Sequence, residues 1–397
     1  MNILILSESV WELGPVYDLH LLAEKLAFFG HKVIAVDPGI DSHRVRKTTT
    51  QIKKISRTSS GKFIKLYTPL YSKVSILSFY KKYKIFKNLE RFSYTKRLID
   101  EILHKESIDI VLDYSVARLA PQALNVCKKN NIPFVHRNVD MQHKLWSTKI
   151  NQFFVRHLEG FVYRSSNRLL ALSPSYAEYL VSLGAKKNLI DLLYFPVETN
   201  IFKPSNKTTH NKNLLFMGML YPFGGVRELI LASVSFFKKY PEFKLSILGY
   251  GPIRREIEEM VNELNLQKKV KVLGFKDFKL MPYYINDSYI CINAFPINSF
   301  TEKIFSAKII QYISCGKPTV STNLIGISSL LPEFESGVIY ATSFRQIFNK
   351  VEAIHLDKKL YSSLSKNGRE YALKNHSLTI IARKLENILK RELWLAK

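Results

Sequence analysis

The chain has 397 residues, of which 46% are hydrophobic and 12% aromatic. This composition is ordinary for a globular protein and excludes a disordered chain. The length exceeds the size at which one hydrophobic core usually stops growing, so two domains are expected. No apolar run reaches the roughly 18 residues of a membrane span, and the N-terminus lacks the basic region of a signal peptide. The cysteines, Cys127, Cys291 and Cys315, form no metal-ligand pattern, which fits a reducing cytoplasm.

The formal net charge of +26 favours polyanionic partners such as nucleic acid, anionic lipid or phosphorylated substrates. Sixteen Lys or Arg residues and one acid, Glu90, lie between Arg44 and Arg97. Aromatic residues are interleaved with them, namely Phe63, Tyr67, Tyr71, Phe79, Tyr80, Tyr83, Phe86, Phe92 and Tyr94. Because this mixture is typical of a membrane interface, we interpret residues 44–97 as a surface for an anionic membrane. A solvated helix face is the alternative. No nucleic acid partner is expected, since zinc-finger spacing and RNP-type motifs are absent.

The N-terminal half alternates strand and helix patterns. The apolar run 2–7 predicts a buried strand, residues 18–29 have helical spacing and end at Gly30, and 32–36 predicts a second strand. Further strands are predicted at 108–112, 133–136, 168–172 and 191–195, and further helices at 120–130, 156–165 and 175–183. Parallel strands joined by helices imply a doubly wound α/β sheet.

A polar segment over residues 197–212 predicts a linker, after which the alternation restarts. Strands are predicted at 213–217, 244–248, 270–273, 289–292 and 318–321, and helices at 226–239, 253–264 and 307–314. The sequence therefore predicts two successive doubly wound α/β domains, residues 1–196 and 213–375.

Ligands of open α/β sheets bind beyond the carboxyl ends of the strands. The loop 7–15 follows the first strand, and its Gly14 either permits close approach to a ligand or is an ordinary turn residue. No G-x-G-x-x-G motif follows that strand, which argues against a dinucleotide oxidoreductase.

Glycines follow three strands of the second domain. Gly218 ends one strand, and the tight loop 221–225, with Gly224 and Gly225, precedes a helix, an arrangement that resembles a phosphate cradle. Gly249–Tyr250 and Gly274–Phe275 end two more strands.

A helix beginning near Ser306 presents its N-terminal amides to an anion. Lys308 and Gln311 lie three residues apart on this helix and face the same side. We expect Lys308 to neutralise phosphate and Gln311 to bind a ribose hydroxyl. The alternative is an amphipathic helix whose polar residues are merely solvated.

Several of these motifs resemble those of the family 4 retaining glycosyltransferases. The segments concerned are 249–252, 274–275, 311–318, the stretch Val197–Pro204, and the preceding Ala171–Leu172–Ser173. The motifs occur in the family's order, and the resemblance extends from about residue 2 to residue 345.

The resemblance implies the GT-B architecture, in which two Rossmann-like domains face each other across a cleft. Residues 1–196 would bind the acceptor, residues 213–375 the nucleotide-sugar donor, and residues 376–397 would form a helix crossing back to the first domain. The donor would be a UDP- or GDP-sugar. No metal and no other cofactor are expected.

The resemblance also assigns residues to the site. His136 matches a family histidine near the transferred sugar, with Asp140 in its neighbourhood, and Glu302 is the third catalytic candidate. A surface histidine in a loop is the alternative for His136. The donor-binding candidates are Gly14, Gly218, Gly224, Gly225, Arg227, Gly249, Tyr250, Phe275, Lys303, Ser306, Lys308 and Gln311.

The chain departs from the family pattern around the donor phosphates. Met219 and Gly224 occupy positions where the family commonly has Arg and Lys, which meet the donor's pyrophosphate. Lys303 and Gln311 replace a pair of glutamates, with Glu302 one position out of register. Losing two cations weakens stabilisation of the leaving diphosphate, unless Lys303, Lys308 or Arg227 substitutes.

These observations predict a hexosyltransferase-like glycosyltransferase with a lipid-linked or cell-surface glycan acceptor, and the family resemblance implies transfer with retention. We expect it in the cytoplasm, peripheral at the inner face of the cell membrane. One alternative is a catalytically inactive GT-B protein that binds nucleotide-sugar or glycan and assists a partner enzyme. Another is a sugar-nucleotide epimerase, which would need no membrane-directed basic segment.

Overall fold

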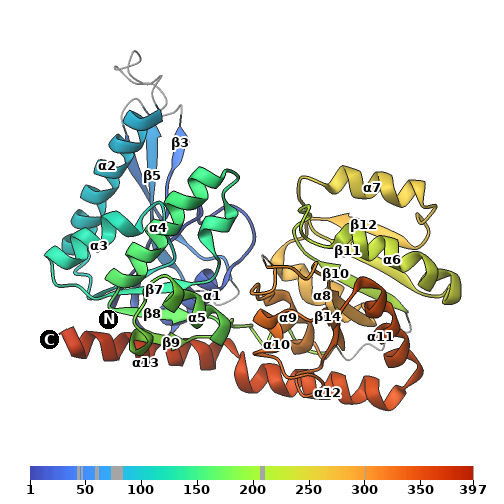
Figure 1. Ribbon diagram of the computed structural model, residues 1–397. Coiled ribbons are helices and arrows are strands. Elements are labelled where there is room, and N and C mark those ends of the chain that lie inside the picture. Colours follow the sequence, from blue (N-terminus) through green and yellow to red (C-terminus); the bar gives the residue numbers. More distant parts are fainter. Residues whose placement is uncertain are drawn as a thin grey trace. The chain divides into compact units, whose positions relative to one another are not determined.

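The computed structural model describes residues 1–42, 45, 48–58, 62–72, 84–205, 211–299 and 301–396. The chain divides into two compact units (Figure 1). Unit 1 comprises Met1–Leu172, Tyr176–Leu193 and Ala382–Lys397, and unit 2 comprises Ser173–Ser175 and Tyr194–Ile381. Each unit is built on its own sheet with helices on both faces, as the alternation of strands and helices predicts.

The sheet of unit 1 has the strand order β3-β5-β2-β1-β6-β7-β8-β9, with β4 paired to β5. Its strands are β1 (Asn2–Leu6), β2 (Lys32–Val36), β3 (Ile40–Ser42), β4 (Thr49–Ile55), β5 (Ile64–Ser72), β6 (Ile110–Asp113), β7 (Phe134–Asn138), β8 (Arg168–Ala171) and β9 (Ile190–Leu192). The β4–β5 pair is antiparallel, and the other pairs are parallel. Residues 3–6 of the central strand β1 are fully buried, because helices cover both faces of the sheet there.

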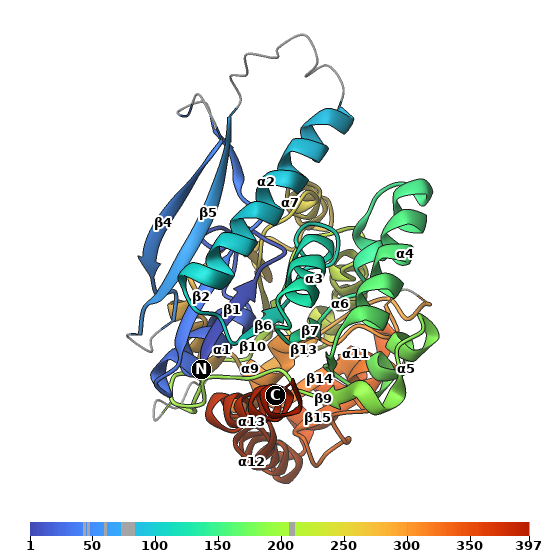
Figure 2. The ribbon, with the colours of Figure 1, turned by 90° about the vertical axis from the view of Figure 1, so that its left-hand side faces the viewer.

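Helices cover the two faces of this sheet. They are α1 (Asp18–Phe28), α2 (Lys84–Lys105), α3 (Ala120–Lys129), α4 (Lys149–Ser165) and α5 (Pro174–Ser182), with short turns η2 (Gln142–Leu145) and η3 (Lys187–Leu189). α2, α3 and α4 lie side by side on one face (Figure 2). α1 lies on the other, as right-handed crossovers require.

The segment 44–97 is more buried than its composition indicates. Its described part forms β4, β5 and much of α2, none of which we predicted. The Tyr67 hydroxyl donates to Glu106 at 2.5 Å, and the Tyr71 hydroxyl bonds Thr95 at 3.0 Å, so both rings belong to the core. Phe63 and Phe92 stay exposed, at 65% and 42%. The side chains of Phe79, Tyr80, Tyr83 and Phe86 lie outside the described residues.

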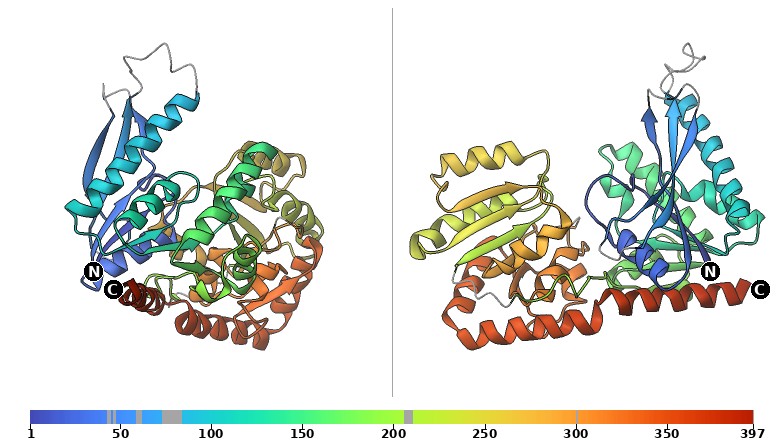
Figure 3. Two further views of the ribbon diagram at one scale, coloured as in Figure 1. Left: turned by 60° about the vertical axis from the view of Figure 1, so that its left-hand side comes forward. Right: turned by 180° about the vertical axis from the view of Figure 1, so that it is seen from behind.

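Unit 2 contains a parallel sheet of order β12-β11-β10-β13-β14-β15 (Figure 3). Its strands are β10 (Asn213–Met217), β11 (Lys244–Leu248), β12 (Val270–Gly274), β13 (Ile290–Asn293), β14 (Thr319–Thr322) and β15 (Val338–Ala341). Its helices are α6 (Val226–Lys239), α7 (Arg254–Glu263), α8 (Met281–Asn286), α9 (Ala307–Ser314), α10 (Ile325–Ser328), α11 (Phe344–Leu356) and α12 (Lys358–Asn375), with the turn η4 (Phe278–Leu280). α6 contacts α7 and α11 on one face, and α9 contacts α12 on the other. The strand order reverses between β10 and β13.

The segment expected to be a linker is anchored to unit 2 from its start. The Val197 N–H donates to His376 O at 2.8 Å, and Val197 O accepts from the Leu378 N–H at 2.9 Å. Phe202 is fully buried, and its carbonyl accepts from Arg369. The main segment of unit 2, Tyr194–Ile381, therefore includes this stretch. Residues 206–210 of this segment lie outside the described part.

The last helix, α13 (Leu378–Ala396), starts in unit 2 and belongs to unit 1 from Ala382 onward. Within unit 1 its Glu386 lies 3.0 Å from His31, which follows α1, and its Glu392 accepts from Arg168 on β8 at 2.8 Å. Burial lowers the pKa of His31. These contacts place the end of the chain against its beginning.

Candidate functional site

The loops after β10 and β11 touch through their backbones. The Gly218 N–H donates to Leu248 O at 2.9 Å. A Cβ on Gly249 would lie 1.7 Å from Gly218 O, and one on Gly251 would lie 2.3 Å from Leu220 O. Only glycine fits at such distances. These predicted glycines thus hold two strand ends together at the carboxyl edge of the sheet.

The loop before α6 folds as a tight turn. The Gly224 N–H donates to Tyr221 O at 2.9 Å, and Gly225 has φ +71°, a conformation that favours glycine, at the start of α6. A Cβ on Gly225 would lie 2.7 Å from Ala294 O, in the loop that follows β13. The turn therefore lies where the strand order reverses, the usual ligand position in open α/β sheets.

Lys308 brings a cation to this loop cluster. A Cβ placed on Gly218 would lie 3.2 Å from Lys308 Nζ, and that nitrogen lies 5.8 Å from the centre of the Phe295 ring. Although the side chain is only half-buried, the surrounding protein lowers the pKa of Lys308 to about 8. The structure thus places Lys308 beside Gly218, as its predicted role requires.

Ser306 occupies the N-cap position of α9, but its hydroxyl does not cap the helix. Its side chain is buried, and its Oγ has no hydrogen-bond partner among the residues that the structure describes. Gln311 lies further along α9 and is half-buried. The preceding Glu302 carbonyl accepts from the Gly326 N–H at 2.8 Å, and Lys303 O is close to the same glycine. Packing against α10 therefore fixes the backbone that leads into α9.

Two exposed aromatic rings lie beyond β11 and β12. Tyr250 and Phe275 are 37% and 53% exposed, and their ring centres are 5.4 Å apart in an edge-to-face arrangement. Exposed ring faces of this kind can stack on a planar base. The two residues were predicted separately, and the fold brings them into contact.

Arg227 is engaged elsewhere. Its guanidinium forms a two-pronged ion pair with Glu256 of α7, and the hydrogen bonds that it donates to Glu256 raise the pKa of Arg227. The sequence offered Arg227 as a substitute for the missing phosphate-binding cations. In the structure its charge is already matched by a carboxylate.

In unit 1, the loop after β1 carries one predicted residue and one that was missed. Gly14 is exposed, with φ +77°, and its carbonyl accepts from Arg57 at 2.8 Å. The missed residue is Glu8, whose carboxylate accepts from the Val116 N–H at 3.0 Å. Its side chain keeps 25% of its surface exposed, yet the surrounding protein raises the pKa of Glu8 to about 7.

His136 is a buried strand residue. The strand β7 runs to Asn138 instead of ending at 136, and His136 lies opposite Asp113 of β6 in the sheet register. Its Nδ1 lies 2.7 Å from Asp113 Oδ2, while its Nε2 is buried without a hydrogen-bond partner among the described residues. Asp113 also accepts from Ser115 Oγ at 2.7 Å, and burial raises its pKa. The alternative of a surface histidine in a loop is therefore wrong.

The residues after His136 continue this acidic and basic cluster. Arg137 is fully buried and donates to Asp18, at the start of α1, at 3.1 Å, and also to Leu193 O. Asp140 is exposed at the surface, but the dense protein around it and the nearby Asp18 charge raise the pKa of Asp140 to about 7. The carboxyl ends of β1, β6 and β7 thus gather ionisable groups.

A second buried histidine–carboxylate pair holds the following loop to α4. Glu159 of α4 accepts from the Gln142 N–H at 2.9 Å, and its other oxygen lies 2.6 Å from His143 Nδ1. The Tyr179 hydroxyl lies 3.1 Å from the same nitrogen. Sequence reasoning missed this pair; its only signal was an acid within an apolar helix.

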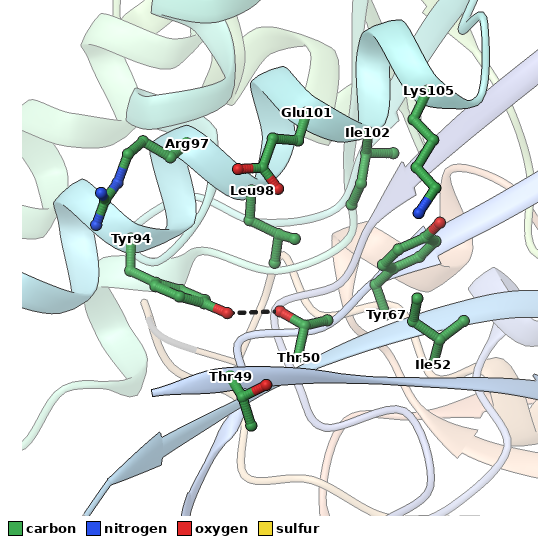
Figure 4. A pocket seen from close by; sticks show the side chains of 10 residues that line it. All are labelled: Thr49, Thr50, Ile52, Tyr67, Tyr94, Arg97, Leu98, Glu101, Ile102 and Lys105. Carbon is green, nitrogen blue, oxygen red and sulfur yellow. Dashed lines mark hydrogen bonds between the residues drawn. The ribbon is translucent and has the colours of Figure 1, made fainter. Parts of the chain in front are cut away.

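A hollow of about 370 Å³ lies between β4 and α2 (Figure 4). Thr50 and Tyr94 face each other across it, with a hydrogen bond of 2.8 Å between their hydroxyls. None of its lining residues belongs to the loops after β1, β6 or β7. This hollow is therefore separate from the candidate site.

Three further findings concern only the described residues. No cluster of three or more His, Cys, Asp or Glu residues is arranged to hold a metal ion. No helix is both long and apolar enough to cross a bilayer. Cys127, Cys291 and Cys315 are buried and free.

Known proteins resemble this chain in sequence and in fold. Residues 197–371 match the family described as glycosyl transferases group 1. A phosphatidylinositol N-acetylglucosaminyltransferase subunit of Homo sapiens is 26% identical over 170 residues, which cover 42% of this chain and 34% of the human protein. Anabaena Alr3699/HepE, in a complex with UDP and glucose, is similar with a TM-score of 0.74 and 15% identity, over 98% of this chain and 99% of that one. Sucrose-phosphate synthase of Thermosynechococcus elongatus is similar with a TM-score of 0.74 and 17% identity, over 100% of both chains.

The matches to curated proteins are partial in length. In the phosphatidylinositol N-acetylglucosaminyltransferase subunits of human, yeast and Arabidopsis thaliana they cover 34%, 52% and 30% of the protein. The likeness to solved structures covers nearly the whole chain.

Proposed function

We propose that this chain moves a sugar from a nucleotide-sugar to an acceptor hydroxyl. The premise is that residues 197–371 match the glycosyl transferases group 1 family and that the chain has the GT-B fold. The predicted GT-B fold is confirmed by the structural neighbours, and the family match together with glycosyltransferase relatives supports that enzyme class. The donor, the acceptor and the retention of configuration are our proposal.

The donor is proposed to bind at the carboxyl edge of the unit 2 sheet. Backbone amides around Gly218 and Gly225 and the N-terminus of α9 would bind the diphosphate, with Lys308 as counter-charge. Tyr250 and Phe275 would contact the base. Gln311 is proposed to bind the ribose, and Glu302 and Lys303 to lie near the transferred sugar. The observation that carries this proposal is the position of Lys308 Nζ beside Gly218.

The acceptor is proposed to bind at the carboxyl edge of the unit 1 sheet, near His136 and Asp140, with Gly14 in the adjoining loop. The Asp113 carboxylate favours the tautomer of His136 that carries hydrogen on Nδ1, which leaves the Nε2 lone pair free to accept from a sugar hydroxyl. We infer transfer with retention, in which the acceptor hydroxyl attacks from the face that the diphosphate leaves.

We propose a UDP- or GDP-sugar donor, no divalent metal, and a lipid-linked or cell-surface glycan acceptor at an anionic membrane. The net charge of +26 and the basic segment 44–97 favour such a surface. The name of the human relative gives phosphatidylinositol as the group modified by that protein, which fits a lipid acceptor. The proposed location is the cytoplasmic face of the cell membrane.

The first test is a thermal-shift screen of the purified chain against UDP-, GDP- and other nucleotide-sugars. Ligand that binds only the native state raises the melting temperature, so one nucleotide should give a selective rise. The rise should persist in EDTA, because no metal is expected at the donor. If no nucleotide-sugar shifts the melting temperature, the proposed donor site is wrong.

A specific departure favours a second candidate, a GT-B protein without catalysis. Met219 and Gly224 replace two cations, and Arg227 is paired with Glu256. Such a protein would still bind nucleotide-sugar or glycan and assist a partner enzyme. Donor hydrolysis or transfer by the purified chain excludes this candidate, whereas a thermal shift without turnover in the presence of lipid-linked acceptors supports it.

A further inference from the structure

α4 has two apolar faces. Successive residues of a helix turn by about 100°. The face that packs against the rest of unit 1 holds the buried residues Val155, Glu159, Val162 and Tyr163. The opposite face holds the exposed residues Ile150, Phe153, Phe154 and Phe161. A surface helix normally carries polar and charged residues on that outer side.

The exposed apolar side chains follow a stripe on this outer side of α4, where the Phe153 ring contacts the rings of Phe154 and the exposed His157. The turn η2 and its next residue add Leu145 and Trp146 to the same end of the helix, at 58% and 38% exposure. We define the outer α4 face as Leu145, Trp146, Ile150, Phe153, Phe154 and Phe161, the last four being 71%, 60%, 62% and 45% exposed. Scattered exposed apolar residues are ordinary, but a contiguous patch marks an interaction surface.

The charges around this stripe have one sign. Lys144, Lys149, Arg156 and Arg164 are all exposed. The one acid between residues 141 and 165 is Glu159, which is buried against His143. Aromatic and aliphatic side chains flanked only by cations complement an anionic lipid surface, where the rings enter the headgroup layer and the cations meet phosphate.

We propose that the outer α4 face inserts into the headgroup layer of an anionic lipid bilayer. The inference rests on the proposed function and assigns it a membrane-contacting element. Glu159 connects α4 to the loop after β7, because it accepts from Gln142 N and His143. Insertion of α4 therefore brings the loop that carries Asp140 to the membrane, where a lipid-linked acceptor resides.

This assignment differs from the one drawn from composition. Among the described aromatic residues of the basic segment 44–97, Tyr67 and Tyr71 are buried in the core, so their rings cannot contact a membrane. Its exposed Phe63 and Phe92 offer a matched control for the outer α4 face, because they are aromatic, exposed to a similar extent and in the same unit.

The test compares Phe153→Gln/Phe154→Gln with Phe63→Gln/Phe92→Gln in the full chain. Glutamine has a high helix propensity, and all four phenylalanines are exposed, so both variants should fold. Co-sedimentation uses vesicles of phosphatidylcholine with and without phosphatidylglycerol. We expect the wild type to bind the anionic vesicles, the α4 variant to bind them at least about tenfold more weakly, and the control variant to change by less than about threefold.

A labelled cysteine supplies a second readout. The three native cysteines are buried, so a cysteine introduced by Ile150→Cys can be labelled selectively with an environment-sensitive dye. Its emission should shift to the blue on addition of anionic vesicles and become protected from iodide, while a dye at Phe92→Cys should not change. Absence of vesicle binding by the wild type, equal binding by the α4 variant, or an unshifted dye at position 150 overturns the inference.

Two controls separate this inference from its premise and from a protein partner. The thermal shift with nucleotide-sugars needs no membrane, so the α4 variant should keep it; loss of that shift in the wild type would contradict the proposed function alone. Light scattering measures whether the outer α4 face joins two copies of the chain. A wild-type dimer that Phe153→Gln/Phe154→Gln converts to monomer would overturn the membrane assignment.

Discussion

The two units hold their candidate residues by different means. In unit 2 the candidate site is mainly backbone, with glycines that let loops touch, a helix N-terminus, and one nearby lysine. In unit 1 it is made of buried ionisable side chains that meet from neighbouring strands, such as His136 with Asp113 and Arg137 with Asp18. Backbone N–H groups can bind an anion whatever the side chains are, so the arrangement in unit 2 suits an anionic ligand. Paired ionisable side chains can orient and select a hydroxyl, so the arrangement in unit 1 suits chemistry at a hydroxyl.

The largest effect on stability is expected at Gly249, one of the glycines that let the loops of unit 2 touch. Replacement by alanine places a Cβ 1.7 Å from Gly218 O, so Gly249→Ala should lower the free energy of unfolding by more than about 3 kcal/mol. Gly30→Ala is the control, since Gly30 also has a positive φ but nothing lies within 4 Å of its Cβ position, and it should cost only about 1–2 kcal/mol. Urea denaturation measures both. Equal losses would mean that the contact between the loops is not tight.

The chemistry of unit 1 is tested at His136 and His143, two of its buried histidines. His136→Gln should lower the transfer rate about 100-fold while leaving the thermal shift by donor unchanged, because the donor site belongs to unit 2. His143→Gln removes a pair of the same kind, bonded to Glu159, and should change the rate only severalfold. A similar loss of transfer rate in both variants would mean that His136 has no role in catalysis beyond that of any buried histidine–carboxylate pair.

The lysine of unit 2 predicts a pH dependence. Since burial lowers the pKa of Lys308 to about 8, its ammonium is present at pH 7 and mostly lost at pH 9. Nucleotide affinity, measured by calorimetry, should therefore fall about tenfold between these values. Lys308→Arg stays charged throughout and should show a flat profile. A tenfold fall in that variant as well would assign the titration to another group.

The smallest effect is expected at Arg227. Its guanidinium is held by Glu256, so Arg227→Ala should change nucleotide affinity by less than about twofold. The same calorimetric titration gives the value. A larger loss of nucleotide affinity would mean that Arg227 leaves Glu256 and binds the donor phosphates. Unit 2 would then also use a charged side chain for recognition, as unit 1 does.

The local parts of this molecule could be predicted from the sequence. β2, β10, β11, α6 and α9 have their predicted bounds, because apolar runs and glycine boundaries are local signals. The glycines at the carboxyl edge of unit 2 were predicted for the same reason. Their mutual contact, and that of Tyr250 with Phe275, depend on which strands are neighbours in the sheet, which the alternation alone does not give.

The remaining features depend on partners distant in the sequence. Asp113 and His136 are neighbours only because β6 and β7 pair in one register. The Arg227 ion pair depends on Glu256 of the next helix, and the burial of Tyr67 and Tyr71 depends on α2. Composition predicted a membrane surface at residues 44–97, a prediction that stays untested. The exposure of the outer α4 face could not be predicted, because it depends on which side of that helix packs against the rest of unit 1.

The path of α13 has a consequence for the order in which the protein is completed during synthesis. N-terminal domains usually fold first as the chain is made. Here, however, Glu386 and Glu392, which pair with His31 and Arg168 of unit 1, are made after the last residue of unit 2. Unit 2 has all of its residues once Ile381 is added. Most of unit 1 is made before unit 2, yet unit 1 is completed only after all residues of unit 2 have been made.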